Sequence, residues 1–375
     1  MHLQPPPIHP IVLPRGAPNE GGSQPEREPG WEDGNEEPDG PVPEGTLVRA
    51  MILAAGLGTR MRPFSELRAK PALPVRGRPV ISLLLHFLAA QGCRQVMVNL
   101  HHRPESIRAA VASDCPPDLD ITWSEEPMPL GTGGGIRRAS DFLAEDEACV
   151  VIAGDMLLDL DLAGHFEAHR ASGREVTLLL HDDPRDGDFG TIGVDANGGL
   201  CRIGSRVVDR AHPEDHSPET ARGLFTGVRF FSRRALENPP RETVFEDLRD
   251  WILPAVEAGT LSVGAERVEA DQIVWEPVGT PAEYLHANLS PPSLPSLGGT
   301  VRHWEGDIEI RGRDRDVIIS RKARVSVDTD LARCVVWDGE EIPAGFRGHD
   351  GVFAGGRFRS CLGDPEASEE SRSRH

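Results

Sequence analysis

Short apolar runs alternate with longer amphipathic stretches between residues 51 and 289. The runs of strand length are 51–54, 96–100, 149–152, 176–180 and 228–231. Residues 79–91 begin with a proline and precede Gly92, and 103–112 also have helical character. Strands that alternate with helices predict an α/β domain with a mostly parallel sheet that is buried on both faces. Ligands of such sheets bind beyond the carboxyl ends of the strands.

The hydrophobic period changes after a segment rich in proline and glycine at residues 290–299, which we interpret as a linker. Positions six residues apart then form two apolar series, which are Val317, Ala323, Thr329 and Val335, and Ile319, Val325, Leu331 and Trp337. A six-residue period is typical of the flat sides of a β-helix. We therefore predict a short, left-handed β-helix-like domain of hexapeptide type at residues 300–363, with an ordinary small β-domain as the alternative.

The two ends of the chain differ in composition from the part between them. Residues 1–46 hold 11 of the 33 prolines and nine acidic residues. Such a segment buries too little apolar surface to offset its ordering entropy, so we predict a disordered tail. The polar residues 364–375 are expected to be loose as well. The folded α/β domain is expected at residues 47–289, and one hypothesis is that the native product begins near Val48.

Charge and composition argue against several functional classes. The chain has 40 basic and 60 acidic residues, a formal charge of −20, whereas a general nucleic-acid binder needs a basic face. No apolar run reaches about 18 residues, so no membrane span is predicted. The Pro-rich start lacks the pattern of a secretory signal. The six scattered cysteines lack the close pairs of a metal site and favour reduced thiols in a cytoplasmic protein.

The strongest chemical signal follows the first apolar run. The sequence there is Leu53-Ala54-Ala55-Gly56-Leu57-Gly58-Thr59-Arg60, and Lys70-Pro71 comes ten residues later. Glycines let backbone N–H groups approach a phosphate, and a guanidinium and an ammonium can neutralise a polyphosphate. A dinucleotide fingerprint would need glycine where Met61 stands, and a P-loop would need Gly-Lys-Ser/Thr. The pattern therefore indicates phosphate binding by neither of these common architectures.

Together these residues resemble the signature of the sugar-1-phosphate nucleotidylyltransferases, or nucleotide-sugar pyrophosphorylases. Three further stretches resemble family motifs in the right order: a second Gly-rich nucleotide loop at 130–135, a metal-binding aspartate in Ala153-Gly154-Asp155, and a closing strand–loop–helix from Trp275 to Pro281. The resemblance implies a Rossmann-like (GT-A-like) domain. It also implies transfer of a nucleoside monophosphate from an NTP to a sugar 1-phosphate, with Mg²⁺ as cofactor and pyrophosphate as product.

By this resemblance each motif residue takes a role. Arg60 would hold the departing β- and γ-phosphates, Lys70 would lie between the α-phosphate and the sugar phosphate, and Asp155 would hold Mg²⁺. Thr226 and Gly227 would line the sugar pocket. The nucleotide-binding positions would be Leu53, Ala54, Ala55, Gly56, Gly58, Thr59, Gly131 and Thr132. The overall resemblance favours a mannose-1-phosphate guanylyltransferase-like or glucose-1-phosphate thymidylyltransferase-like enzyme, and an amino-sugar uridylyltransferase is the next alternative.

Two positions depart from the family pattern. Pro277 stands where the family usually has an aspartate as second metal ligand, and its neighbour Glu276 is a candidate substitute although adjacent strand residues face opposite ways. Residues 199–206 lack the family's sugar-phosphate lysine, which leaves Arg202 and Arg206 as candidates. These departures keep two alternatives open. One is a catalytically weak or inactive regulator that binds nucleotide or sugar phosphate, and the other is cytidylyl or guanylyl transfer of the molybdopterin type.

The C-terminal region raises the question of a second, acyltransferase activity, as in bifunctional relatives. Such sites form between longer β-helices than residues 301–359 can build. We therefore expect this region to serve packing or homo-oligomerisation.

Overall fold

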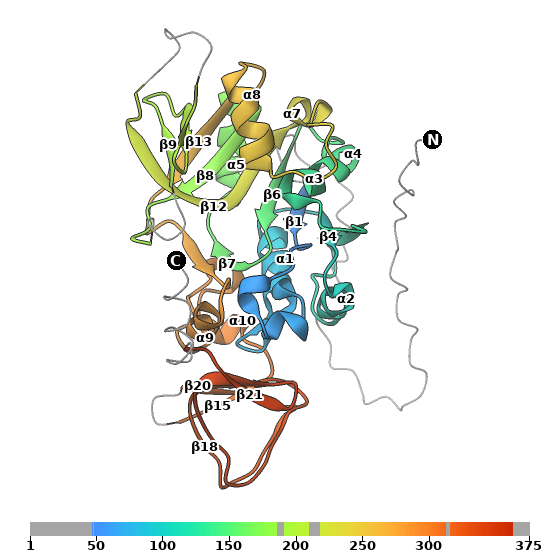
Figure 1. Ribbon diagram of the computed structural model, residues 1–375, viewed down its shortest axis with the longest axis vertical. Helices are drawn as coiled ribbons and strands as arrows, with labels where there is room; N and C mark the ends of the chain where they lie inside the picture. The colour runs from blue at the N-terminus through green and yellow to red at the C-terminus, as the bar shows by residue number, and fades with distance from the viewer. Residues whose placement is uncertain (1–46, 48, 186–190, 210–217, 313–315, 363–375) are drawn as a thin grey trace, which may run out of the picture.

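The computed structural model describes residues 47, 49–185, 191–209, 218–312 and 316–362. The predicted tails at 1–46 and 364–375 lie outside the described residues. An α/β domain forms the upper part of the molecule in Figure 1, and a coil of strands with a triangular outline lies below it. The predicted α/β fold with a C-terminal strand-rich region is thus confirmed.

Four neighbouring strands of the ten-stranded central sheet are parallel. They run in the order β5 (Asp120–Glu125), β4 (Gln95–Leu100), β1 (Arg49–Leu53) and β6 (Ala148–Ala153). Alternate side chains enter different cores, since Ala50 and Ile52 pack on one face of β1 and Met51 on the other. Burial on both faces explains why these strands read as continuous apolar runs in the sequence.

The other half of the sheet is organised by the long strand β12 (Ala221–Ser232), which is antiparallel to β6. It also pairs with β8 (Val176–His181) and β9 (Thr191–Val194). Beyond these lie β13 (Val263–Val268), β10 (Leu200–Ile203) and β11 (Arg206–Val207). These pairs are antiparallel except for β8 with β13, which is parallel, so the sheet changes from parallel to mixed between β6 and β12.

Helices cover both faces of this sheet, as predicted. One core contains side chains from α1 (Val80–Ala90), α2 (Pro104–Ser113), α5 (Leu162–Ser172) and α9 (Pro281–Leu289). The opposite core contains side chains from α3 (Gly131–Arg138), α4 (Ser140–Leu143), α7 (Arg233–Glu237), the π-helix η5 (Asp247–Ile252) and α8 (Leu253–Glu257). Among the described residues, no helix has the length and apolar character needed to cross a membrane.

The segment between β1 and α1 carries the signature residues and contains three short 3-10 turns. These are η1 (Thr59–Met61), η2 (Phe64–Glu66) and η3 (Lys70–Ala72), and the hairpin β2 (Pro74–Val75) and β3 (Arg78–Pro79) follows them. A separate two-stranded sheet pairs β7 (Met156–Asp159) with β14 (Val274–Pro277). It joins the end of β6 to the start of α9.

The predicted linker at 290–299 is itself folded, with the 3-10 turn η6 (Pro295–Leu297) closed by a bridge between Leu294 and Gly299. Helix α10 (Val301–Trp304) then leads into the C-terminal coil. The strands of its larger sheet are β15 (Ile308–Arg311), β16 (Val317–Ser320), β18 (Asp330–Val336), β20 (Arg347–Ala354) and β21 (Arg357–Ser360). A smaller side pairs β17 (Arg324–Val325) with β19 (Glu341–Ile342).

The predicted hexapeptide register is wrong by one residue per coil. Val317 pairs with Cys334, and Cys334 with Gly351, so each coil takes 17 residues rather than three hexads. Neighbouring strand residues face opposite ways, so this shift separates positions that the hexads stacked together. Val317 lies inside the coil, whereas Val335 packs into the core shared with the α/β domain.

Candidate functional site

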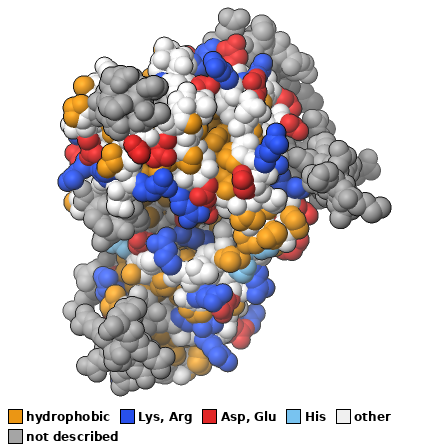
Figure 2. Space-filling view, turned by 45° about the horizontal axis from the view of Figure 1, so that its top comes forward, with side chains coloured by type: hydrophobic (Ala, Val, Ile, Leu, Met, Phe, Trp, Pro, Cys, Tyr) orange, Lys and Arg blue, Asp and Glu red, His pale blue; other side chains and the backbone are white. Residues whose placement is uncertain are grey.

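A cavity of about 740 Å³ opens at the carboxyl ends of β1, β4 and β6. This volume lies in the usual range of small-molecule sites. Most of the residues predicted from the sequence line it: Leu53, Ala54, Ala55, Gly56, Gly58, Thr59, Arg60, Lys70, Gly131, Thr132, Asp155 and Gly227. On the face drawn in Figure 2, basic side chains gather across the middle of the molecule with acidic ones beside them.

The turn after β1 depends on Gly58. Its φ is +60°, and a Cβ there would lie 3.1 Å from the Ser65 Cβ, so a larger residue would be both strained and crowded. The turn brings two cations together. A point at the Cβ position of Gly279 is 3.5 Å from Lys70 Nζ and 3.6 Å from Arg60 Nη2. Both cations therefore converge beside the segment that precedes α9.

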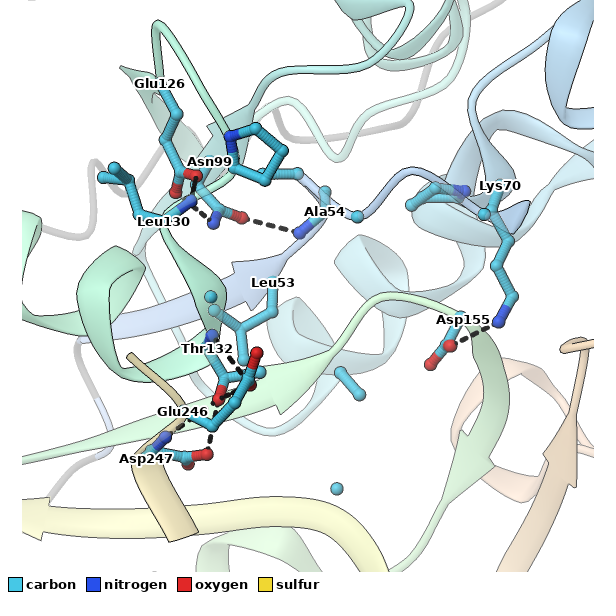
Figure 3. A pocket seen from close by; sticks show the side chains of 18 of the residues that line it. Leu53, Ala54, Lys70, Asn99, Glu126, Leu130, Thr132, Asp155, Glu246 and Asp247 are labelled. Carbon is cyan, nitrogen blue, oxygen red and sulfur yellow. Dashed lines mark hydrogen bonds and ion pairs between the residues drawn. The ribbon is translucent and has the colours of Figure 1, made fainter. Parts of the chain in front are cut away.

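Lys70 and Asp155 form an ion pair at this end of the cavity. Lys70 Nζ donates to Asp155 Oδ2 at 2.5 Å, and Figure 3 shows the pair across the cavity from Asn99 and Glu126. The lysine side chain is 11% exposed and the aspartate side chain 41%. The carboxylate is thus open to a ligand while the ammonium is held by its own partner.

Asp155 is suited to hold a divalent cation. In phosphate-binding sites Mg²⁺ is commonly held by one or two carboxylates together with substrate phosphates. Within the described ranges, no group of three or more metal-ligating side chains occurs, so a cage made of protein ligands alone is not found there. The donor set around Asp155 therefore fits a cation shared with a phosphate ligand.

Glu276, the substitute ligand considered from the sequence, does not line the cavity. Its Oε1 lies 3.6 Å from Arg185 Nη1, and burial raises the pKa of its carboxyl. Pro277 pairs with Met156, directly after Asp155. Another carboxylate lies beside the cations. Glu283 Oε2 accepts from the Gly279 N–H at 2.8 Å, and the Cβ position of Gly279 is the point that lies close to both Lys70 and Arg60.

The opposite end of the cavity holds a carboxylate–amide pair that the motif search missed. Asn99 Oδ1 accepts from the Ala54 N–H at 2.6 Å, and Asn99 Nδ2 donates to Glu126 Oε1 at 2.7 Å. The Leu130 N–H donates to Glu126 Oε2 at 3.1 Å. Glu126 is 5% exposed, and burial raises the pKa of its carboxyl. The pair joins the first glycine-rich segment to the second.

The second glycine-rich stretch is helical rather than a loop, which corrects the sequence interpretation. Gly131 and Thr132 open helix α3. A Cβ on Gly133 would lie 2.3 Å from Cε2 of Phe245, and one on Gly134 would lie 2.6 Å from the Thr243 carbonyl oxygen. The glycines are therefore needed because α3 packs closely against the chain that leads into η5.

A second polar network ties the start of α3 to β12. Thr132 Oγ1 donates to Asp247 Oδ1 at 2.6 Å and lies 2.7 Å from Glu246 Oε2. Asp247 forms a buried ion pair with Arg229, 2.6 Å from Oδ2 to Nε, and Arg229 Nη1 donates to the Gly227 carbonyl. The sequence predicted Thr132 as a cavity residue but not Arg229, Glu246 or Asp247, because no spacing links these residues to Thr132.

The two predicted sugar-pocket residues behave differently. Gly227 lines the cavity, but Thr226 is 2% exposed and does not. The Thr226 hydroxyl donates to the Leu179 carbonyl at 2.9 Å, and its own carbonyl accepts from Trp275 Nε1 at 2.8 Å. These two hydrogen bonds of Thr226 connect β12 to β8 and to β14. Arg202 also lies away from the cavity, paired with Glu219.

Replacing Gly227 by alanine is expected to destabilise the fold by about 1–3 kcal/mol. Its φ is +85°, and the new Cβ would lie 2.9 Å from the Ala153 Cβ. Urea unfolding measures the change. Gly173→Ala is the matched control, because Gly173 has φ +66° but nothing within 4 Å of a new Cβ. Equal losses in the two variants would show that the contact with Ala153 adds nothing.

The chain is similar to several characterised proteins. A sequence model of the nucleotidyl transferase family matches residues 49–291. Mannose-1-phosphate guanylyltransferase of Mycobacterium tuberculosis is 29% identical over 311 residues, which is 80% of this chain and 82% of the relative. UTP–glucose-1-phosphate uridylyltransferase of Synechocystis sp. is 29% identical over 307 residues, or 79% of this chain and 72% of the relative.

Solved structures share the fold. The crystal structure of HddC from Yersinia pseudotuberculosis matches with a TM-score of 0.52 and 22% identity, and the match covers 64% of this chain and 98% of that chain. A further crystal structure of that protein is a complex with GMP-PN. At this identity the likeness supports the architecture of the α/β domain.

Proposed function

The chain belongs to the nucleotidyl transferase family, and on that premise we propose that it transfers a nucleoside monophosphate from an NTP to a sugar 1-phosphate. Relatives that align with about four fifths of the chain carry names of sugar-1-phosphate nucleotidylyltransferases, which favours an enzyme over a binding-only regulator. The observation that carries the proposal is the convergence of Arg60, Lys70 and Asp155 in one cavity with the carboxylate–amide pair of Asn99 and Glu126.

The reaction needs alignment and charge neutralisation more than it needs a base. An oxygen of the sugar 1-phosphate forms a bond to the α-phosphorus of the NTP. The bond from that phosphorus to the oxygen bridging to the β-phosphate breaks, and pyrophosphate leaves with the electron pair. The nucleophile is already an anion, so no proton has to be removed from it. Catalysis then depends on positioned cations and on holding two polyanions in line.

The residues at the end of the cavity that holds Arg60 and Lys70 bind and align the phosphates. Lys70 lies between the α-phosphate and the sugar phosphate and exchanges Asp155 for these anions when substrate binds. Arg60 holds the β- and γ-phosphates, and the backbone N–H groups of Gly58 and Thr59 bind phosphate oxygens. The 2.5 Å contact with Asp155 keeps the Lys70 ammonium in place before the substrate arrives.

Enzymes of this family generally use a divalent metal ion, and we assign Mg²⁺ to Asp155. The bound ion would neutralise phosphate charge. Asp155 suits this role because its carboxylate is open to the cavity, next to Lys70. We do not propose Glu276 as a metal ligand, because it contacts Arg185 outside the cavity.

We further propose that the end of the cavity that holds Asn99 and Glu126 binds guanine. This makes GTP the nucleotide, with a hexose 1-phosphate as the acceptor. Guanine presents two neighbouring N–H donors on its pairing edge, at N1 and N2, whereas uracil and thymine present one N–H between two carbonyls. Each Glu126 oxygen accepts one protein hydrogen bond and retains a second lone pair. The two relatives described above are a guanylyltransferase and, at the same identity, a uridylyltransferase, so the assignment of the base rests on the geometry of Glu126.

Glu126→Gln is expected to lower kcat/KM for GTP by about 10- to 100-fold, because a hydrogen bond to a charged group contributes about 1.5–3 kcal/mol. The activity profile should move too. Protonation of Glu126 turns one carboxylate oxygen into a donor, so the side chain can no longer accept from both guanine N–H groups. Because burial raises the pKa of this carboxyl, GTP affinity is expected to fall on acidification at a higher pH than it would with an ordinary glutamate, whose pKa is about 4.3. The measurement is kcat/KM for GTP and UTP from pH 4.5 to 8.

The contribution of Glu126 to folding stability should change with pH in the opposite direction to GTP affinity. A carboxyl whose pKa is raised by folding contributes fully below its unfolded pKa, and that contribution is lost as the pH rises through the folded pKa. At pH 7 the raised pKa alone would favour Glu126→Gln. The glutamine amide nitrogen would however face one of the two donors, Asn99 Nδ2 or the Leu130 N–H, and leaving a buried donor without an acceptor costs about 1–3 kcal/mol, so the variant is expected to gain no stability. If Glu126→Gln retained the preference for GTP over UTP, base selection would depend on residues other than Glu126.

The compartment that suits the chain is the cytoplasm. The six cysteines carry thiols, and burial raises the pKa of Cys93 to about 12 and that of Cys115 to about 11. Thiols in this state are inert and stay reduced in the cytoplasm. We include a cytoplasmic location and homo-oligomerisation through the C-terminal region in the proposal.

Pyrophosphate release with Mg²⁺ tests the function directly. GTP, dTTP, UTP, CTP and ATP are each combined with a panel of sugar 1-phosphates. Release that requires GTP together with one sugar phosphate supports the proposal in full, whereas release with UTP or dTTP retains the reaction and moves the base assignment. If nucleotide binds by calorimetry but no pair releases pyrophosphate, the chain is a binding-only member.

A further inference from the structure

The turn η2 lies between the two cations of the site and is in contact with the C-terminal coil. The ring of Phe64 on this turn is fully buried, 5.9 Å from that of Trp337, measured between centroids. Arg68 follows the turn, stacks on Trp337 at 4.7 Å and donates to Asp338 Oδ1 at 2.7 Å. A Cβ on Gly355 would lie 3.0 Å from the side chain of Leu67. Four contacts thus connect the coil to residues 64–68, which comprise η2 and the two residues after it.

The same tryptophan reaches the chain that follows Lys70. Trp337 Nε1 donates to Tyr284 Oη at 2.8 Å, and Tyr284 Oη donates to the Pro74 carbonyl at 2.7 Å. Tyr284 is fully buried on α9, and its ring lies 5.9 Å from that of Phe64. The segment that carries both cations is therefore held at its middle and just beyond Lys70 by one aromatic group.

The local structure of this segment gives it little stability of its own. Its 3-10 turns are three residues each, and such turns have poorer hydrogen-bond geometry than α-helix. Catalytic groups must keep their positions to within about 0.5 Å. The precision has to come from tertiary contacts, and the contacts described above come largely from the coil and from α9.

We infer that the C-terminal coil is a structural part of the catalytic centre, with Trp337 as the positioning residue that fixes Arg60 and Lys70 through Phe64 and Tyr284. This inference rests on the proposed function for its kinetic effect only. It goes beyond general packing, because it ties one side chain of the coil to the placement of two cations in the other domain.

The test compares Trp337→Ala with Phe353→Ala in the full-length chain. Phe353 is the matched control, because its buried ring lies inside the coil against Phe346, at 5.4 Å, away from the cations. Trp337→Ala is expected to lower kcat about 10- to 100-fold, the cost of a displacement of about 1 Å, with a smaller change in KM. Phe353→Ala is expected to lower the unfolding temperature but to retain kcat well below that temperature.

Hydrogen–deuterium exchange of residues 59–73 supplies a reading that needs no turnover. Trp337→Ala is expected to speed exchange of these amides about fivefold or more and Phe353→Ala to leave them unchanged, because the ring of Trp337 contacts Phe64 on η2 whereas the ring of Phe353 packs inside the coil. Trp337→Phe retains the ring contact with Phe64 and loses the hydrogen bond to Tyr284, so its kcat should lie between those of wild type and Trp337→Ala. If Trp337→Ala folds poorly, kcat and the exchange of residues 59–73 in Trp337→Phe decide the question.

The outcomes separate the two proposals. Equal exchange and equal kcat in the Trp337 and Phe353 variants overturn the positioning role, while a working wild type keeps the proposed function. Faster exchange of 59–73 in the Trp337 variants, with no turnover by wild type, supports the positioning role and removes the proposed function.

Discussion

Replacing Lys70 by alanine is expected to lower kcat for pyrophosphate release by about 10³-fold, as loss of a key charge-stabilising donor does elsewhere. In the proposed reaction, negative charge crowds around the α-phosphorus as two phosphates approach. Lys70 lies at that point, 2.5 Å from Asp155, with a side chain only 11% exposed. In such a partly dry site a cation acts more strongly than it does in water. Single-turnover kinetics under saturating substrates measure the chemical step.

Lysine is almost absent from this chain, which sharpens the experiment. Lys70 and Lys322 are the only two lysines, and the remaining 38 basic residues are arginines. Lys322→Ala is the control, because it removes the same charge from an exposed turn of the coil. Lys70→Arg should recover little activity, since a planar guanidinium does not replace a compact ammonium between two phosphates. Turnover of Lys70→Ala at the wild-type rate would remove Lys70 from the mechanism.

The fold was largely predictable because its strands are buried on both faces. Apolar runs such as 96–100 and 149–152 leave few alternatives to a central strand, and they became β4 and β6. The period of the coil was not predictable in the same way. A single residue changes a coil from 18 to 17 residues, and apolar residues at both Val335 and Val336 let either register look plausible. The pairing of Val317 with Cys334 decides it.

The site was predictable where the chemistry lies in one continuous motif. Arg60 and Lys70 stand within a short segment, so their convergence follows from local sequence. Glu126 and Asp247 reach the cavity from separate elements, and each carries out its role through a partner distant in sequence, Asn99 and Arg229. Such pairs are set by sheet order and helix packing, which no spacing encodes.

Asp155→Asn is expected to lower kcat about 10²-fold and to raise the Mg²⁺ concentration needed for half-maximal activity about tenfold or more. The amide keeps the shape of the side chain and an oxygen that can accept from Lys70, but it loses the charge that a hard cation requires. Kinetics at graded Mg²⁺ measure the shift. Binding of Mn²⁺ with a non-hydrolysable nucleotide, followed by electron paramagnetic resonance, reports the same site without turnover.

Glu276→Gln separates the two metal assignments that the sequence left open. If the cation is held by Asp155 and phosphate oxygens, neutralising Glu276 leaves the Mg²⁺ dependence unchanged, because that carboxylate faces Arg185 rather than the cavity. If local rearrangement brings Glu276 to the metal, both variants shift the Mg²⁺ dependence together. Pro277 makes the first result the expected one. Proline offers no side-chain ligand at that position, so substrate phosphates and water would complete the coordination, and the apparent Mg²⁺ affinity should rise with nucleotide concentration.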